Sequence, residues 1–402
     1  MSDLSIEISE SLQAGDNSTK LLKVAMVAGE ASGDMLASLL LKSLSQKWNS
    51  LDAFGIGGPN MESKGFRTWW PSEKLAVQGF GLDVLWRYRE IVGIRNKLYR
   101  RLIKNPPNIF IGIDAPDFNL NLETALKSQG IKVIHFVSPS FWAWRENRVK
   151  KLKNSVDHVL CLFPFEPNLL AEHGVPATFI GHPLANIIPQ VADRQKARRF
   201  LKFNESDDVV AILPGSRRSE ILYLASPFFL AARLLLNHRP NLKLIVPAIP
   251  AWRVLIEEAA KKAGIFNNIQ ILTGNSHNVL EACDVALVAS GTATLEAALF
   301  KRPMVIAYKM SWLSWQIMKR KKIQPWIGLP NILSQSFVVP ELLQDAVTPE
   351  NLEKEISNWL DAKSKSPEKI HKLEGYFSLM HSSLQCNTAE LAVNAIKKII
   401  EA

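Results

Sequence analysis

Short apolar runs alternate along the chain with longer stretches in which apolar residues recur at helical spacing. The first apolar run, Lys23–Ala28, ends at a loop of small residues, Gly29–Gly33. Beyond this loop the apolar positions fall on one helix face: Leu36, Leu39, Leu40 and Leu44. The pattern predicts a strand, a tight loop and a helix that begins near Asp34, which is the repeating unit of an α/β sheet.

The same unit recurs in two series. Further strands are predicted at 108–113, 132–137, 158–162 and 177–180, and then at 209–213, 242–246, 269–272, 285–288 and 304–308. Strands and helices that alternate at this spacing indicate parallel sheets covered by helices on both faces. We therefore predict an α/β protein built from two doubly wound, Rossmann-like domains.

Shifts in composition suggest the boundaries of these domains. Residues 1–20 are polar and acidic, without the basic start and apolar centre of a signal peptide, and are expected to form a flexible tail. The two domains are expected at 21–186 and 209–372, joined by a charged linker at 187–208. Residues 373–402 are expected to form a helical segment that could cross back to the first domain.

No apolar run reaches the ~18 to 20 residues that a membrane-spanning helix needs. The nearest, Ile221–Leu236, is interrupted by Pro227 and Arg233. The three cysteines, Cys161, Cys283 and Cys386, lie far apart, so the sequence predicts neither a disulfide framework nor a zinc site, and a reducing compartment is the default.

The net charge of +10 suits phosphorylated substrates, an anionic membrane face or nucleic acid. Lysine and arginine form no block longer than about four residues and no nucleic-acid motif is present, so we expect no nucleic-acid partner.

Loops at the carboxyl ends of parallel strands are where ligands bind, and one of them predicts an anion site. The stretch Val285–Ala298 is an apolar strand, a small-residue turn and a helix start. Free amides and the helix dipole favour an anion there. Ser290, Gly291 and Thr292 leave a phosphate room to approach, Thr292 and Thr294 add hydroxyls, and Glu296 could accept from a sugar hydroxyl. The alternative is an ordinary turn capped by serine.

Two further loops carry candidate chemistry. Asp114 and Asp117 follow a strand, where a carboxylate can act as a general base, or where both can simply form a turn. Arg217 follows Ser216 after another strand and could grip a diphosphate with its planar guanidinium, or pair with Glu220. Arg218 is a weaker candidate.

Other polar residues lie at the same sheet edges. His182 could touch a phosphate or satisfy a backbone carbonyl, and the second role is favoured; Asn331 could donate to a ligand or cap a turn. Three more are candidates for lining the cleft: Glu30, Ser32 and Ser138. No cluster has metal-ligand spacing, and the glycines at 54–58 are interpreted as a plain turn because the third glycine of a dinucleotide fingerprint would fall at Asn60.

Two stretches, Trp69–Lys104 and Met310–Trp326, combine tryptophans with lysines and arginines. Helices of this composition lie in membrane interfaces, with apolar side chains on one side and basic side chains on the other. The alternative is a pair of amphipathic helices packed on the protein's own core, with solvated charges.

Five motifs in order resemble the lipid-A-disaccharide synthase family: Ala28–Asp34, Gly112–Asn119, Val137–Trp144, Leu213–Arg217 and Ala289–Glu296. The resemblance implies a GT-B glycosyltransferase that binds a nucleotide sugar in its second domain and an acceptor in its first. It implies inverting transfer from UDP-2,3-diacylglucosamine to 2,3-diacylglucosamine 1-phosphate (lipid X), which yields a β-1,6 disaccharide and UDP. It implies no cofactor, and a peripheral place on the cytoplasmic face of the inner membrane. The oligomeric state stays open, a homodimer included.

The resemblance also implies roles for the candidate residues. Asp114 or Asp117 would deprotonate the acceptor hydroxyl, and Asp117 is preferred because it lies further along the loop. The donor-binding candidates are Arg217, Ser216, Ser290, Gly291, Thr292, Glu296 and Asn331. Among them, the Ser290 turn would hold the diphosphate and Glu296 the ribose.

Three other functions compete with this one. A UDP-sugar 2-epimerase would need acid and base groups around the sugar C2 but no apolar, basic acceptor surface. An NAD-dependent oxidoreductase is disfavoured by the broken glycine fingerprint. A non-catalytic protein that binds UDP or lipid would share the same loops.

Overall fold

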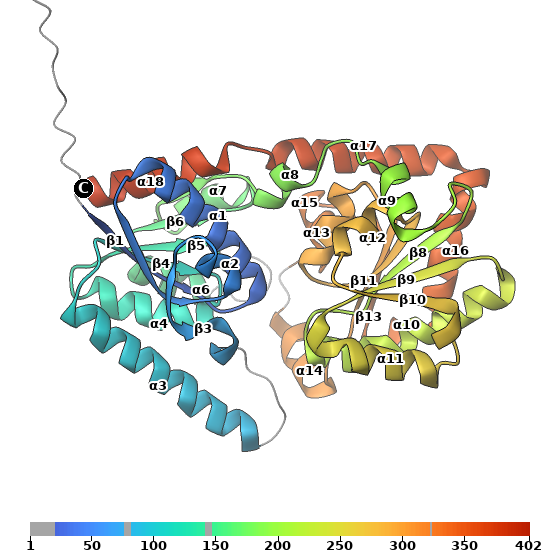
Figure 1. Cartoon of the computed structure of the whole chain (residues 1–402), viewed down its shortest axis with the longest axis horizontal. Coiled ribbons are helices and arrows are strands. Elements are labelled where there is room, and N and C mark those ends of the chain that lie inside the picture. The colour runs from blue at the N-terminus through green and yellow to red at the C-terminus, as the bar shows by residue number, and fades with distance from the viewer. Residues whose placement is uncertain (1–20, 76–81, 141–146, 322–323) are drawn as a thin grey trace, which may run out of the picture.

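The computed structural model describes residues 21–75, 82–140, 147–321 and 324–402 (Figure 1). It contains two parallel sheets, each covered by helices on both faces, as the sequence predicts. Phe80 and the aromatic residues of 141–144 lie outside the described residues.

The first sheet has seven strands in the order β3-β2-β1-β4-β5-β6-β7. Their bounds are β1 Leu22–Ala28, β2 Leu51–Gly57, β3 Arg67–Pro71, β4 Ile109–Ile113, β5 Lys132–Phe136, β6 His158–Cys161 and β7 Ala177–Phe179. The strand order reverses between β1 and β4, so the crevice of this sheet opens at the carboxyl ends of these two strands.

The second sheet has six strands in the order β10-β9-β8-β11-β12-β13. Their bounds are β8 Val209–Leu213, β9 Lys243–Ala248, β10 Ile269–Thr273, β11 Val285–Ala289, β12 Met304–Tyr308 and β13 Glu341–Leu343. Here the order reverses between β8 and β11, which places a second crevice after Leu213 and Ala289.

Helices of the first half cover its sheet on two sides. They are α1 Ala31–Lys47, α2 Pro59–Glu62, α3 Leu82–Lys104, α4 Pro116–Lys127, α6 Asn147–Ser155 and α7 Glu166–Glu172. The short helix α8 Pro183–Ile187 follows, and its Leu184 and Ala185 are buried in the core of the second half. One core joins α1 to the sheet, and the other joins α3, α4 and α6 to its opposite face. Both faces of the strands are therefore buried, which explains their continuous apolar runs.

The second half is built in the same way. Its helices are α9 Arg194–Leu201, α10 Arg218–His238, α11 Arg253–Lys262, α12 Ser276–Ala282, α13 Thr292–Leu299, α14 Trp312–Lys321, α15 Leu329–Leu333, α16 Pro349–Lys365 and α17 Pro367–Leu384. The last helix, α18 Thr388–Glu401, packs against α1 and the strands β5 to β7 of the first sheet. Figure 1 shows α17 and α18 running along the upper edge from the second domain to the first.

The stretch 187–208 is more than a connecting segment. It contains α9, which packs against α12 of the second domain. Arg198 of α9 is fully buried and donates to four carbonyls, those of Ala282, Asn204, Glu205 and Asp207, and to the Asp284 carboxylate at 2.8 Å. The low apolar content of α9 therefore does not indicate a flexible linker. The helix is held in the second domain by the buried Arg198, whose three guanidinium nitrogens are all hydrogen-bonded.

Helix α10 is the one described helix whose length and composition would allow it to cross a membrane. Its interior side is nonetheless packed, since Phe228 and Phe229 are fully buried and the helix contacts α11 and α16. In the fold it is a core helix of the second domain, with Pro227 inside it.

Several local expectations were wrong in detail. Helix α1 begins at Ala31 rather than near Asp34, whose buried carboxylate accepts hydrogen bonds from the amides of Gly58, Asn60 and Met61 at 2.8–3.1 Å. The glycine turn is shorter than expected, because Gly57 and the residues before it belong to β2. The short edge strands β3 and β13 carried no clear periodicity and were not predicted.

The aromatic and basic stretch at 69–104 is also not one helix. Trp69 lies in β3, where its ring stacks on Phe54 at 4.7 Å and lies under the guanidinium of Arg101 at 3.7 Å. Helix α3 follows separately, and the side chains of Trp86 and Arg87 lie outside the described residues.

Candidate functional site

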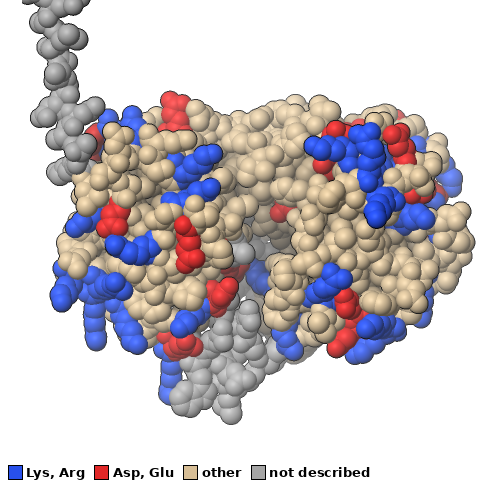
Figure 2. All heavy atoms as spheres, in the orientation of Figure 1, with Lys and Arg blue, Asp and Glu red and all other residues tan. Residues whose placement is uncertain are grey.

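The crevices of the two sheets face each other. The loop after β1 contributes Glu30 and the loop after β8 contributes Arg217, and these two side chains form an ion pair of 2.8 Å between the domains. Figure 2 shows the molecular surface hollowed between the two halves. The strand order and this contact together place four loops around one space: those after β1, β4, β8 and β11.

Asp114 follows β4 directly and begins a strained turn. Asp114 and Ala115 both have left-handed backbone angles, with φ of 49° and 43°, and Ala115 caps α4. Such angles cost non-glycine residues about 1–3 kcal/mol each and persist where neighbouring contacts enforce them. Here the side-chain amide of Asn119 donates to the Asp114 carbonyl oxygen at 2.8 Å.

The surroundings of Asp114 change the pKa of its carboxyl group. Burial raises its pKa above the ordinary value, and the charge of Glu30 raises it further. Charges on His135 and Arg217 and the amide of Ala115 act in the opposite direction. A carboxyl group with a raised pKa at the end of a strand fits general-base chemistry. Asp117, by contrast, is exposed on the first turn of α4.

Arg217 stands at the start of α10 with two carboxylates around it. Its guanidinium contacts Glu30 of the other domain and Glu220 at 3.1 Å, while Glu220 also accepts from the amides of Ser216 and Arg217. Desolvation lowers the pKa of Arg217, but the two carboxylates outweigh it and raise the pKa above its ordinary value. The expected pair with Glu220 is present, and the contact with Glu30 shows that Arg217 also reaches the interdomain space.

The loop after β11 has the geometry expected of an anion site. Helix α13 begins at Thr292, so the amides of Thr292 and Ala293 have no partner within the helix, whereas the Thr294 amide donates to the Gly291 carbonyl oxygen at 3.1 Å. Thr292 and Gly291 are exposed, and nothing lies within 4 Å of a side chain built at Gly291. Thr294 differs from expectation: it is buried and its hydroxyl donates to the Gly291 carbonyl oxygen at 2.7 Å, so it braces the turn.

Glu296 lies one turn further along α13. Its carboxylate is 3.6 Å from His277 of α12. Burial raises the pKa of Glu296, and His277 lowers it. This partly buried carboxylate is available to accept a hydrogen bond from a ligand hydroxyl.

Two candidates have structural partners for their side chains. Asn331 is fully buried; its amide donates to the Val339 carbonyl and to Glu341, and its oxygen accepts from the amides of Val338 and Val339, all within 3.0 Å. The geometry therefore supports the turn-capping role over ligand binding.

His182 is buried at the start of α8, where its Nδ1 accepts from the Leu184 amide at 3.2 Å. Burial lowers the pKa of His182 to about 4, so the ring is neutral near pH 7. A neutral, capped imidazole supports the structural role that the sequence favoured over phosphate contact.

The remaining cleft candidates, Glu30, Ser32 and Ser138, differ in their surroundings. Glu30 reaches the interdomain space through its pair with Arg217. Ser32 lies in the first turn of α1 and is partly buried. Ser138 follows β5, is 5% exposed, and its hydroxyl has no hydrogen-bond partner in the described structure.

A buried polar cluster behind Asp114 was missed from the sequence. Asn119 and Glu123 of α4 and His135 of β5 are all fully buried, and His135 Nδ1 lies 2.6 Å from Glu123 Oε1. The signal was present: a histidine interrupts the apolar run of β5, and two polar residues four positions apart lie on the inward face of α4. Gly112 of β4 leaves the space that the Glu123 carboxylate occupies.

Gly112→Ala is expected to lower the free energy of unfolding by about 1–3 kcal/mol, because overpacking forces the neighbours to move. An added Cβ would lie 2.0 Å from Glu123 Oε1 and 3.1 Å from the Asn119 Cβ. Denaturant unfolding measures the loss. Gly93→Ala in α3 is the control, since nothing lies within 4 Å of its Cβ and it should be neutral or stabilising. Equal stability of both variants would contradict the steric argument.

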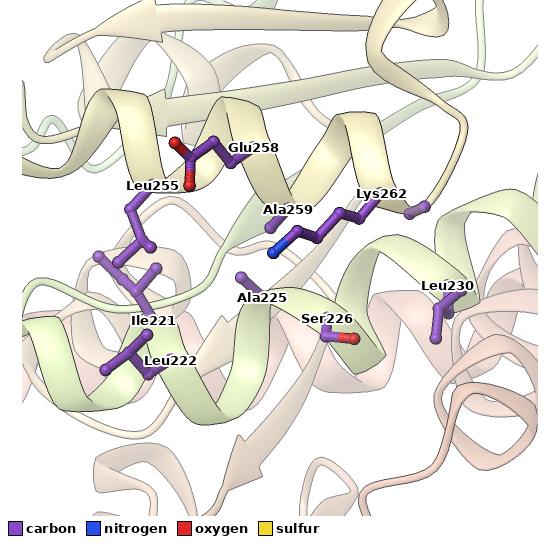
Figure 3. Close-up of a pocket in the computed structure, with 10 residues that line it drawn as sticks. Ile221, Leu222, Ala225, Ser226, Leu230, Leu255, Glu258, Ala259 and Lys262 are labelled. Carbon is purple, nitrogen blue, oxygen red and sulfur yellow. The ribbon is translucent and has the colours of Figure 1, made fainter.

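An apolar groove elsewhere is separate from these loops. It has a volume of about 250 Å³ and runs between α10 and α11, where Ile221, Leu222 and Leu255 line it and Glu258 and Lys262 border it (Figure 3). None of the candidate site residues lines it. Among the residues that the structure describes, no group of three His, Cys, Asp or Glu side chains is placed to hold a metal ion.

Solved structures with a similar fold span nearly the whole chain. UDP-GlcNAc 2-epimerase from Neisseria meningitidis bound to UDP-GlcNAc has a TM-score of 0.64 at 12% identity, covering 94% of this chain and 100% of its own. An S. aureus MnaA-UDP co-structure has a TM-score of 0.67 at 12% identity, covering 95% and 97%. At these identities the likeness shows the shared two-domain GT-B fold.

Sequence relatives are far closer. A family model described as lipid-A-disaccharide synthetase matches residues 24–396. Proteins named lipid-A-disaccharide synthase are 60% identical in Albidiferax ferrireducens, over 94% of this chain and 98% of that protein, and 57% identical in Verminephrobacter eiseniae, over 94% and 97%. With the motifs of all four cleft loops inside the matched region, the chain belongs to the lipid-A-disaccharide synthase family of glycosyltransferases.

Proposed function

We propose that the chain transfers the diacylglucosamine unit of UDP-2,3-diacylglucosamine to the 6′-hydroxyl of 2,3-diacylglucosamine 1-phosphate, with inversion, to form a β-1,6 disaccharide and UDP. The observation that carries the proposal is the convergence of a raised-pKa aspartate and an arginine, from opposite domains, on one interdomain space. The family places lipid A disaccharide synthesis in the same chain.

Donor binding is assigned to the second domain. The turn formed by Ser290, Gly291 and Thr292 would hold the diphosphate with the free amides at the start of α13, because a helix N-terminus favours negative charge. Glu296 would accept from the ribose. The neighbours solved with UDP or UDP-GlcNAc have the same fold, which supports a uridine nucleotide as the donor carrier.

We assign the base to Asp114 in preference to Asp117. The sequence favoured Asp117 because it lies further along the loop. Asp114, however, is electrostatically linked to both Glu30 and Arg217 across the interdomain space, whereas Asp117 is exposed on the outer first turn of α4. The acceptor hydroxyl would lose its proton to Asp114 while its oxygen attacks the sugar C1 and the bond from C1 to the UDP oxygen breaks. One base and one leaving group on opposite faces give inversion.

Charge on the departing UDP would be stabilised by the protein itself. The guanidinium of Arg217 and the amides of Thr292 and Ala293 are preorganised donors, and such donors stabilise a developing anion without reorganisation. Arg217 would exchange its ion pair with Glu30 for the diphosphate.

Chelation is therefore expected to leave transfer within about twofold of its untreated rate, because preorganised amides and a guanidinium supply the charge stabilisation. The measurement is turnover with and without EDTA on the same preparation. Complete loss of turnover that added Mg²⁺ restores would overturn this account.

Both substrates carry acyl chains, so we also propose that the enzyme works peripherally on the cytoplasmic face of the inner membrane. Trp312 of α14 is 69% exposed, and the exposed Lys319 lies about two turns further along the same helix. In Figure 1, α14 and the N-terminal end of α3 lie along the same lower edge. This edge is the proposed contact with anionic lipid.

Trp312→Ala is expected to weaken association with anionic liposomes by about fivefold to tenfold, because an exposed indole is lost from the interface. Sedimentation with vesicles measures the partition. Leu379→Ala is the matched control, since Leu379 is 72% exposed on α17 at the opposite edge. Unchanged partitioning of Trp312→Ala, or an equal loss in both variants, would reject this face.

The direct test of function is incubation with UDP-2,3-diacylglucosamine and lipid X, followed by mass analysis and nuclear magnetic resonance of the product. The proposal expects a disaccharide 1-phosphate with a β-1,6 linkage and one UDP per disaccharide. A donor that is epimerised at C2 when lipid X is omitted would point instead to the chemistry of the structural neighbours.

A further inference from the structure

Packing alone does not explain why the pair Glu123–His135 is buried. Both side chains are fully buried, yet Glu123 Oε2 and His135 Nε2 lack partners in the described structure, as do the nearby Asn119 Oδ1 and Ser138 Oγ. Buried polar atoms without partners cost stability and concentrate where function needs them. This group therefore calls for a functional explanation.

The pair lies directly behind the proposed base. Gly112 pairs with His135 in the register of β4 and β5, and it precedes Asp114 by two residues. Asn119, on the same α4 face as Glu123, donates to the Asp114 carbonyl oxygen at 2.8 Å. The Asp114 amide donates to the Phe136 carbonyl oxygen, next to His135, at 2.9 Å. The strained turn at Asp114 is thus held by the elements that carry the pair.

We propose that Glu123 and His135 are positioning residues that hold the Asp114 turn and keep the Asp114 carboxylate ionised beside its substrate. The inference rests on the proposed function, because it takes Asp114 as the base. Glu123 Oε1 and His135 Nδ1 are 2.6 Å apart, so a proton lies between them. Glu123 thereby fixes the imidazole on β5, the strand next to the one that ends before Asp114.

Among the described residues, the charged groups that bear on Asp114 come from four elements. Glu30, in the loop after β1, opposes ionisation of Asp114, whereas His135 of β5 and Arg217, at the start of α10, favour it. Glu123 of α4 lies behind His135. Arg217 is also assigned to the diphosphate, so while the donor is bound His135 is the remaining side chain, of those the structure describes, that favours ionisation of Asp114. Loss of the His135 charge should raise the pKa of Asp114.

The test is the pH dependence of kcat in Glu123→Gln and His135→Gln. Glutamine at 123 keeps the size and an acceptor for the imidazole N–H but removes the negative charge that faces His135. In each variant the acid limb of the profile should move up by about one pH unit, a rate loss of about tenfold at a pH below the inflection. At high pH the rate should approach that of the unaltered enzyme.

The double variant removes both charged groups and should show a shift no larger than that of His135→Gln, because Glu123 acts on Asp114 through His135. Asp157→Asn is the matched control: its carboxylate also joins α4 to β5, contacting Lys127 at 3.3 Å and the Val133 amide at 2.8 Å, but it is partly exposed and is not among the main influences on the pKa of Asp114. This control should lose some stability and keep its inflection.

An unmoved inflection in Glu123→Gln and His135→Gln, at any level of activity, would show a purely structural pair and overturn the inference. If one variant fails to fold, the other decides the outcome. Asp114→Asn separates the two proposals. If Asp114→Asn is inactive and the inflections of the pair variants do not move, Asp114 remains the base and only the role of the pair is rejected. If Asp114→Asn is active, both the assignment of the base and the role of the pair are rejected.

Discussion

Asp114→Asn is expected to lower kcat by about 10²- to 10⁴-fold, the range that general-base catalysis contributes. The amide keeps the size of the carboxyl group and can hold the same turn, but it cannot accept the proton of the acceptor hydroxyl. Affinity for UDP should change little, because the assigned diphosphate contacts lie in the second domain. Steady-state kinetics and calorimetric titration with UDP measure the two effects separately.

Asp117→Asn is the companion variant. It removes an exposed carboxylate three residues further along the same loop and should retain most of the activity. The reverse result, a collapse of kcat in Asp117→Asn with Asp114→Asn nearly unaffected, would return the base to the position that the sequence favoured.

The Asp114→Asn variant also leads to a prediction about protein stability. Because burial raises the pKa of Asp114, the folded protein holds that proton more tightly than the unfolded chain does. Ionisation of Asp114 therefore costs folding free energy above the unfolded-chain pKa of about 3.9, and that cost is absent below it. Asp114→Asn should accordingly be at least as stable as the unaltered protein at pH 7. A lower melting temperature at pH 7 would contradict the direction of the pKa shift.

Arg217→Lys is expected to lower kcat by about 10²- to 10³-fold and to weaken UDP binding. Lysine keeps the positive charge, but it loses the planar fork that can hold two oxygens of a diphosphate at once. It would also disrupt the paired contacts with Glu30 and Glu220 that hold the side chain at the domain boundary.

Arg218→Lys is the matched control, because Arg218 is the adjacent residue, is exposed, and lies on the first turn of the same helix. Its activity should stay within about threefold of the unaltered enzyme, as for surface substitutions generally. Equal losses in both variants would mean that general positive charge near α10 matters, and not the fork of Arg217.

Much of the architecture could be predicted from local sequence patterns. Apolar runs such as Val285–Ala289 predict buried parallel strands because both faces of such strands are covered, and the periodic leucines after Gly33 predict α1. Loops that follow strands, including those with Asp114 and Ser290, were identified as candidate ligand sites because parallel strands end at one sheet edge.

Some edge strands and the roles of the cap residues were harder to predict from the sequence. β13 spans only Glu341–Leu343, too short for alternation to register, and Trp69 is in a strand although its neighbours suggested a helix. The sequence left Asn331 open between a ligand contact and a turn cap, and it favoured a structural role for His182 without identifying the partner, because a buried polar group takes whatever partners the fold supplies. Those partners are backbone groups and a carboxylate in distant or neighbouring turns, which no spacing rule reveals.

By itself, the sequence determined the α/β class, the repeated strand–loop–helix units, the family and the loops that carry chemistry, because each is written in residues close together along the chain. Only the tertiary structure decided which strands flank each crevice, that Arg217 meets Glu30 across the domains, and that Glu123 and His135 lie buried behind Asp114. These relations depend on strand order and on packing between segments far apart in sequence, where the energy of a buried charge or a strained turn is set by neighbours that local periodicity does not specify.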